Sequence, residues 1–220
     1  MKKITALLFT LISVLALSLA GCSNGGTFTE KSYASGENEI EKVTVQVSDR
    51  EVEVSPSEDD QIYVEYFDSE KEYLDISVSE NKELVINLVY DKDWTDFIGT
   101  KPSAEYRKII IKIPNGLISS FSANTTNENI KVSALSFTQQ VSLDSNGGDV
   151  VCDRVNAGKT ISLKAKDGDI RGTIVGGWDD FSIVCTIKKG DSNLPASKDG
   201  GEKSLTADCN NGDIDIEFVA

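Results

Sequence analysis

Histidine is absent from the 220 residues of this chain. Its absence excludes Ser-His-Asp and Cys-His catalysis, zinc sites with histidine ligands, and the usual side-chain switch at physiological pH. Most hydrolase mechanisms are excluded with them. For this and for further reasons given below, we expect a protein that is not an enzyme, with no catalytic residue, no metal site and no cofactor.

Cysteine is nearly as scarce, with four residues in the chain. If Cys22 carries a lipid, as argued below, Cys152, Cys185 and Cys209 remain, so at most one disulfide forms and a disulfide framework is excluded. Cys185 and Cys209 occupy the same position of an internal repeat, which predicts reduced thiols that point inward from neighbouring coils as small fillers. We expect Cys152 to be buried in another ladder of that repeat.

Basic residues are outnumbered, with 22 Lys and Arg against 36 Asp and Glu, a formal charge of -14. Loss of the first 21 residues removes Lys2 and Lys3 and leaves 20 basic against 36 acidic residues, a charge of -16. Such a surface repels nucleic acid and anionic lipid headgroups. We expect no nucleic-acid partner, and membrane attachment through a lipid rather than through a basic face.

The N-terminus has the three parts of a secretory signal. Met1-Lys2-Lys3 is positive, Ile4–Leu17 is apolar, and Leu19-Ala20-Gly21-Cys22 closes the segment with small residues before a cysteine. The apolar stretch is too short for a spanning helix. The tetrapeptide resembles the bacterial lipobox, in which the cysteine is acylated before cleavage makes it the new N-terminus.

The leader therefore predicts a palmitate-type lipid on Cys22 and an extracytoplasmic position at the cell membrane or cell surface. We expect residues 1–21 to be the signal peptide and residues 22–38 to be the lipidated cysteine with a flexible tether. An ordinary signal peptide with an incidental cysteine is the alternative.

From Glu39 to Ile113, apolar and polar residues alternate with a period of two, the pattern of half-buried strands. The apolar positions are Val43, Val45, Val47, Val52, Val54, Ile62, Val64, Tyr66, Leu74, Ile76, Val78, Leu84, Ile86, Leu88, Ile109, Ile111 and Ile113. Charged or turn-forming breaks separate them at hairpin spacing. Residues 91–108 lack the alternation and predict a longer loop.

An internal repeat occupies about residues 118–220. Each unit has an apolar residue, Ser or Thr, then Ala, Leu or Ile, followed by a turn and an Asp or Asn. The units begin at Phe121, Val141, Ile161, Phe181 and Leu205. Their turn residues are Asn129, Asp149, Asp169, Asp191 and Asp213, spaced by 20, 20, 22 and 22 residues.

This period predicts a solenoid, because a single coil has too little apolar surface to be stable and stacking joins the coils into one core. The first and third residues of each unit should form two inward ladders, and a further ladder should contain Ile130, Val150, Ile170 and Ile214, with the polar Ser192 as its exception. Glycines such as Gly168 should supply positive φ at the corners. The fourth unit has two extra residues, where we expect a bulge at 187–191.

The Asn/Asp-Gly-Asp-Ile/Val units, the Ile113-Pro114-Asn115-Gly116 bridge, the alternating strands and the leader resemble a bacterial family of adhesin-like proteins with β-strand repeats, the toast-rack domain of unknown function 4097. The resemblance covers roughly Glu39 to the end. It implies an all-β fold, a right-handed parallel β-solenoid or β-helix-like repeat domain, preceded by a strand-rich N-terminal half that shares the core. We expect a single domain over residues 39–220. The family defines no catalytic residue.

Two classes of function fit these features. The favoured one is a non-enzymatic surface lipoprotein, an adhesin or a binding or scaffold module of the cell envelope with a glycan or protein ligand. The alternative is a carbohydrate-active β-helix enzyme, since Asp149 and Asp169 on adjacent coils would lie roughly 5 Å apart, near the separation of a retaining carboxylate pair. These Asp residues recur in nearly every coil, whereas an active site needs one unusual coil.

Three aromatic residues are candidate ligand contacts: Trp94 and Phe97 in the long loop, and Trp178. An exposed tryptophan can stack on sugars or anchor a protein partner. Capping of the core is the favoured role.

The ladder of Asn129, Asp149, Asp169, Asp191 and Asp213 would place carboxylates close together along one corner. Calcium could neutralise them, but hydrogen bonds from turn amides are the favoured solution. In the last strand, acidic residues alternate with apolar ones. Acidic edges discourage strand addition, so we expect a monomer.

Overall fold

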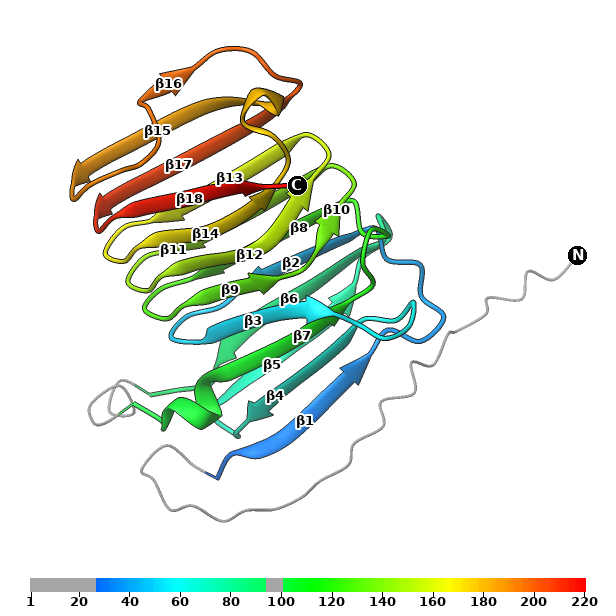
Figure 1. Cartoon of the computed structure of the whole chain (residues 1–220). Coiled ribbons are helices and arrows are strands. Elements are labelled where there is room, and N and C mark those ends of the chain that lie inside the picture. Colours follow the sequence, from blue (N-terminus) through cyan, green and yellow to red (C-terminus); the bar gives the residue numbers. More distant parts are fainter. Residues whose placement is uncertain (1–26, 94–100) are drawn as a thin grey trace, which may run out of the picture.

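The computed structural model describes residues 27–93 and 101–220, which form two nine-stranded sheets that face each other (Figure 1). Sheet A has the order β1 (Thr29–Ala34), β4 (Tyr63–Asp68), β7 (Lys108–Ile113), β3 (Glu51–Pro56), β9 (Ile130–Ser133), β12 (Val150–Ala157), β14 (Ile170–Val175) and β18 (Ile214–Val219), with β10 (Ser136–Phe137) paired to β12. Sheet B has the order β16 (Ser197–Lys198), β15 (Phe181–Lys189), β17 (Lys203–Asn211), β13 (Thr160–Ala165), β11 (Gln140–Ser145), β8 (Ser120–Thr125), β2 (Lys42–Gln46), β6 (Glu83–Tyr90) and β5 (Glu72–Val78). Two 3-10 turns, η2 (Ala104–Arg107) and η3 (Trp178–Asp180), complete the described chain. Over the described ranges, no helix has the length and apolar character needed to cross a bilayer.

The coils stack in parallel and mostly contribute one strand to each sheet; the fourth unit contributes β15 to sheet B and only an isolated bridge at Ser192 beside sheet A. The predicted register is confirmed for four units, because Phe121, Val141, Ile161 and Leu205 are successive partners across β8, β11, β13 and β17. In sheet A, Ile130, Val150, Ile170 and Ile214 are partners in the same way, and Ser192 bridges to Ile214. All of these apolar residues are buried. Each large aliphatic contributes roughly 1.5–3 kcal/mol relative to exposure, so the ladders dominate stability.

The alternating strands upstream are confirmed as strands, but their expected hairpin arrangement is largely wrong. β2 and β3 lie in opposite sheets and form another coil of the same solenoid, with Val43 opposite Phe121 and Val52 opposite Ile130. β6 and β7 form the next coil outward, parallel to β2 and β3. Of these strands, β5 and β6 do pair as the expected antiparallel hairpin.

The two last repeats stack in an order that differs from their order in the sequence. β17 lies between β13 and β15, so the fifth unit is inserted between the third and the fourth (Figure 1). The partner of Leu205 is Ile183 rather than Phe181, which faces Lys203. The two extra residues of the fourth unit therefore lie at the start of β15, and the expected bulge at 187–191 is wrong.

The end of the stack that carries β1 is closed by antiparallel strands. β1 pairs with β4, and β4 pairs with β7. Because residues 29–34 are part of sheet A, the expected tether over 22–38 is too long. The far end is covered in sheet B by β16, which pairs antiparallel with β15.

Close stacking at one corner explains the glycine in the Asp-Gly turn. A β-carbon on Gly168 would lie 2.4 Å from the carbonyl oxygen of Gly148 in the preceding coil. Gly168 is absent from the residues with positive φ, whereas Gly212 has a φ of 149°. The glycine at 168 therefore serves close approach of the coils, not the positive φ that the sequence suggested.

Candidate binding sites

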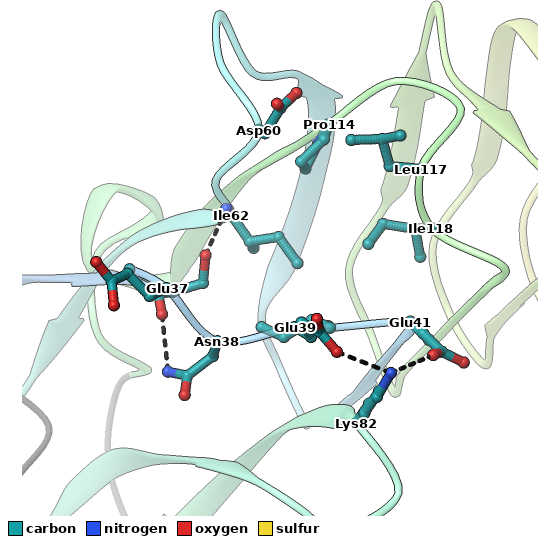
Figure 2. Close-up of a pocket in the computed structure, with 13 residues that line it drawn as sticks. Glu37, Asn38, Glu39, Glu41, Asp60, Ile62, Lys82, Pro114, Leu117 and Ile118 are labelled. Carbon is teal, nitrogen blue, oxygen red and sulfur yellow. Dashed lines mark hydrogen bonds and ion pairs between the residues drawn. The ribbon is translucent and has the colours of Figure 1, made fainter. Parts of the chain in front are cut away.

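A hollow of about 490 Å³ opens at one corner of the stack, near the end that carries β1 (Figure 2). Four separate connections line it: residues 35–41 between β1 and β2, the turn before β4, the β5–β6 turn and the β7–β8 turn. Its apolar floor contains Ile62 and Ile118, which are buried, and Leu117, whose side chain is 58% exposed. The sequence does not predict this hollow, because its residues come from turns far apart in the chain. The apolar Leu117 directly after an Asn-Gly turn is the one local signal.

The rim of the hollow is acidic. Glu37, Glu39, Glu41 and Asp60 line it, together with Lys82. The Nζ of Lys82 lies 2.9 Å from a carboxylate oxygen of Glu39 and 2.9 Å from one of Glu41. The hydrogen bond and the charge of Lys82 lower the pKa of Glu39, and the two carboxylates raise the pKa of Lys82.

The expected corner ladder is present, and its side chains are engaged with the backbone. In each step, an Oδ1 accepts the backbone N–H of the next ladder residue: Asn129 from Asp149 at 2.8 Å, Asp149 from Asp169 at 3.0 Å, Asp169 from Asp213 at 3.0 Å, and Asp213 from Asp191 at 2.8 Å. The order of these bonds follows the stacking order of the coils. The ladder therefore holds one coil to the next along the corner.

An arginine also neutralises part of this ladder. Arg171 donates to Asp149 at 2.7 Å and to Asp169 at 3.3 Å. Among the residues described, no group of three or more acidic or cysteine side chains is placed to hold a metal ion. The bonds from backbone amides and from Arg171 are what the turn role of Asp149 and Asp169 requires.

The outer face of sheet B carries rows of hydroxyl side chains. Ser122, Ser142 and Ser162 are successive partners across β8, β11 and β13, and the row continues to Thr44 on β2 and Thr206 on β17. In residues 27–93 and 101–220, the hydroxyls of the three serines make no hydrogen bond to another residue. Within the row, the hydroxyl of Thr44 does so, because it donates to Glu83. The repeat contained this signal as its Ser or Thr position.

The middle of this face contains one ion pair, and Asp208 on β17 is a further acidic residue beside it. The Nζ of Lys164 on β13 lies 3.1 Å from a carboxylate oxygen of its partner Asp144 on β11. The middle of sheet B therefore presents hydroxyls and a compensated ion pair, in a chain with a formal charge of -14.

Of the predicted aromatic contacts, the structure places Trp178 only. It begins η3, is 42% exposed, and contacts Phe218 edge-on with the ring centroids 5.5 Å apart. The Nζ of Lys198 lies 5.5 Å from its ring centroid. Trp178 therefore both covers the end of the core and keeps part of one face open. Trp94, Phe97 and the lipid attachment residue Cys22 lie outside the described residues.

The three described cysteines are free and buried. Burial raises the pKa of Cys152 to about 12. Cys185 and Cys209 lie on neighbouring strands, but Cys185 is the partner of Ala207, and Cys209 is the partner of Ile187. The sequence predicts that the two cysteines are partners, but they are offset by two residues. The cause is the two extra residues at the start of β15, which shift Phe181 in the same way.

Comparison with known proteins identifies the sequence pattern and the fold. The profile of the Toastrack DUF4097 family matches residues 40–176. A crystal structure of a candidate cell adhesion protein from Clostridium sporogenes has a TM-score of 0.58 and 12% identity, covering 88% of this chain and 100% of that one. A candidate adhesin from Bacteroides fragilis has a TM-score of 0.35 and 15% identity, covering 90% and 100%. No curated protein matches the chain.

Proposed function

This chain belongs to the Toastrack DUF4097 family, and on that premise we propose that it is a non-enzymatic, lipid-anchored binding module of the bacterial cell envelope. Cys22 carries the lipid, the chain lies on the outer side of the membrane, and the solenoid holds a glycan against the outer face of sheet B. The domain is monomeric, begins near β1 and runs to the C-terminus.

The in-register hydroxyl row carries this proposal. Neighbouring strands in a sheet lie about 4.8 Å apart, so Ser122, Ser142 and Ser162 repeat at a regular interval on a face that is backed by the core. Each hydroxyl is both a donor and an acceptor, as sugar hydroxyls are, and none of the three is hydrogen-bonded to another described residue. A neutral glycan loses little by approaching this face, whereas an acidic polymer meets the charge of the whole domain.

The carbohydrate-active enzyme is the weaker reading because the paired carboxylates are already occupied. The Oδ1 atoms of Asp149 and Asp169 accept backbone amides, and their Oδ2 atoms accept from Arg171. A general acid or nucleophile needs a carboxylate that is open to the substrate. Both residues instead serve the corner of the stack.

The anchor is tested by Cys22→Ser in the natural host. We expect the wild-type chain in the membrane fraction, labelled by a palmitate analogue, and the variant unlabelled and released into the medium or the periplasm. Retention of the variant in the membrane fraction would contradict the lipid anchor.

The binding face is tested by sedimentation of the protein with insoluble cell-wall glycans. Ser142→Glu places a charge in the centre of the hydroxyl row. Ser55→Glu is the matched control, because Ser55 points outward from β3 on the opposite sheet, beside Lys112. We expect Ser142→Glu to remain in the supernatant and Ser55→Glu to sediment like the wild type. Equal behaviour of the two variants would remove sheet B as the site.

A further inference from the structure

We infer that the hollow lined by residues 35–41 and by the turn at Leu117 is a docking site for a short, basic and amphipathic segment of a partner protein. In this complex an apolar side chain of the partner packs on Leu117 and Ile118, and an adjacent lysine or arginine pairs with Glu37 or Asp60. The inference uses a different surface from the proposed glycan face and does not depend on it.

The charge of the rim selects a cationic partner. Four carboxylates line the hollow, and Lys82 is the one basic residue among its lining residues. Lys82 is engaged by Glu39 and Glu41, whereas Glu37 and Asp60 have no ion pair or side-chain hydrogen bond among the residues that the structure describes. Figure 2 shows the carboxylates of Glu37 and Asp60 on different sides of the opening. Two negative charges are thus left to pair with a ligand.

The position of Lys82 shows that the rim accommodates an ammonium group between two carboxylates. Its ammonium group comes from the β5–β6 turn and sits between two carboxylates of the β1–β2 connection, at 2.9 Å from each. Backbone hydrogen bonds join these two segments, since the N–H groups of Glu41 and Lys42 donate to the carbonyl of Lys82 at 2.8 and 3.2 Å. The connection therefore presents its acidic side chains from a preformed position, which lowers the ordering cost of binding.

The floor of the hollow is apolar, so a ligand needs an apolar group for the floor in addition to a cation for the rim. Ile62, Pro114, Leu117 and Ile118 form it, and Leu117 is the most exposed large apolar residue of the described chain, at 58%. Covering an exposed leucine is favourable, by roughly 25 cal/mol for each Å² removed from water. Figure 2 shows Leu117 and Ile118 on the side of the opening across from Glu37. A free metal ion or polyamine would use the rim and leave this floor uncovered.

The size and openness of the hollow favour a peptide segment. Its volume of about 490 Å³ lies within the usual range of ligand pockets. It is an open hollow formed by surface turns, so an extended peptide can lie across it. The negative charge of the domain repels anionic lipid headgroups, so a membrane surface is not the partner. A basic segment of a protein supplies both the cation and the apolar side chain.

The test measures fluorescence anisotropy of a short labelled peptide that alternates lysine and leucine. The protein is the mature chain with Cys22→Ser, which is free of lipid and of detergent. We expect saturable binding that weakens as salt increases, because exposed ion pairs are screened. In the double variant Glu37→Gln, Asp60→Asn, the dissociation constant should rise about tenfold, as expected for two partly exposed ion pairs. Leu117→Asn should weaken binding by a similar factor.

Matched controls separate the site from the overall charge. Asp179→Asn, Glu202→Gln removes the same two charges at the opposite end of the stack and should bind the peptide like the wild type. A peptide that alternates glutamate and leucine should not bind. The residues substituted in the two double variants and in Leu117→Asn are all exposed, and the melting temperature of each variant should match that of the parent protein.

Three results would overturn the inference: no saturable binding to the wild type, an equal loss in the two double variants, or spermine competing fully while Leu117→Asn has no effect. The last result would leave a simple cation site. Because no glycan is present in this assay, failure here leaves the glycan proposal intact, and failure of the glycan assay leaves this inference intact.

Discussion

The side chain of Asn193 makes both hydrogen bonds to the backbone of Ile216 that an added strand would make. Its Nδ2 donates to the carbonyl of Ile216 at 3.0 Å, and its Oδ1 accepts the N–H of Ile216 at 3.1 Å. The backbone N–H of Asn193 donates to the carbonyl of Ile214 at 3.1 Å. Asn193 thus occupies the outer edge of β18, in addition to the acidic residues that the sequence pointed to.

We predict that Asn193→Ala opens this edge. The substitution removes the two bonds to Ile216, which should lower the free energy of unfolding by about 1–3 kcal/mol and expose backbone groups for pairing between molecules. Sedimentation velocity should then show concentration-dependent association. Asn81→Ala, in the exposed β5–β6 turn, is the control and should stay monomeric. A monomeric Asn193→Ala would mean that the acidic residues protect the edge without it.

The sequence predicts the repeating part of this fold well because its period fixes both spacing and face. The ladders at Phe121, Val141 and Ile161 are correct because an apolar residue shifted by one position would point to solvent. The turn role of Asp169 follows from the same period, because equivalent turn residues of stacked coils lie side by side and its Oδ1 can accept the N–H of Asp213.

Stacking order is not contained in the period. The strand that begins the coil of Leu205 could have stacked outside β15, in the order of the sequence, or between β13 and β15, since all of these strands present similar apolar ladders. In the structure β17 pairs with both β13 and β15, and β16 folds back to cover the other edge of β15. The hollow could not be predicted for a related reason, because no sequence pattern indicates that Glu37 and Leu117 line the same hollow.

We predict that the carbonyl-type oxygen of Asp169, rather than its charge, stabilises the corner. Its Oδ1 accepts the N–H of Asp213 at 3.0 Å. Asp169→Asn keeps this acceptor, whereas Asp169→Ala should cost about 1 kcal/mol more in urea unfolding. Equal losses for the two variants would show that the pairing with Arg171 matters more.

Calcium should leave the melting temperature of the domain unchanged at millimolar concentration. A ligand that binds only the folded state must raise this temperature, and the ladder oxygens are already used by backbone amides and by Arg171. A rise of several degrees that is lost in Asp149→Asn, Asp169→Asn would contradict the turn role.

The thiols of the folded domain should be unreactive and unbridged. With a pKa of about 12, Cys152 has roughly one thiolate in ten thousand at pH 8. Cys185 and Cys209 are offset by two residues on adjacent parallel strands, which puts their α-carbons about 8 Å apart, beyond the reach of a disulfide. Mass spectrometry after iodoacetamide treatment should find modification only in denaturant. A native Cys185–Cys209 bridge would refute the observed register.

The edge of β5 leads to a pH-dependent prediction. The Oδ1 of Asp68 accepts the N–H of Leu74 at 2.9 Å, on the side of β5 away from β6. Burial raises the pKa of Asp68 above its ordinary value, and the bond from Leu74 and the charges of Lys31 and Arg50 offset only part of this rise. The folded state therefore binds the proton more tightly than the unfolded state.

With the folded pKa raised, the stability from proton binding is complete below the unfolded pKa and is lost as the pH rises through the folded pKa. Ionised Asp68 is thus a net cost at pH 7. Asp68→Asn keeps the acceptor for Leu74 without that cost, so it should raise stability at pH 7 by at most about 1 kcal/mol, because the carboxyl is partly solvated. At pH 3.5 the variant and the wild type should be alike in urea unfolding. Asp75→Asn, at an exposed position of β5, is the control and should leave the free energy of unfolding unchanged at both pH values. A loss of stability at pH 7 in Asp68→Asn would show that attraction to Lys31 and Arg50 outweighs burial.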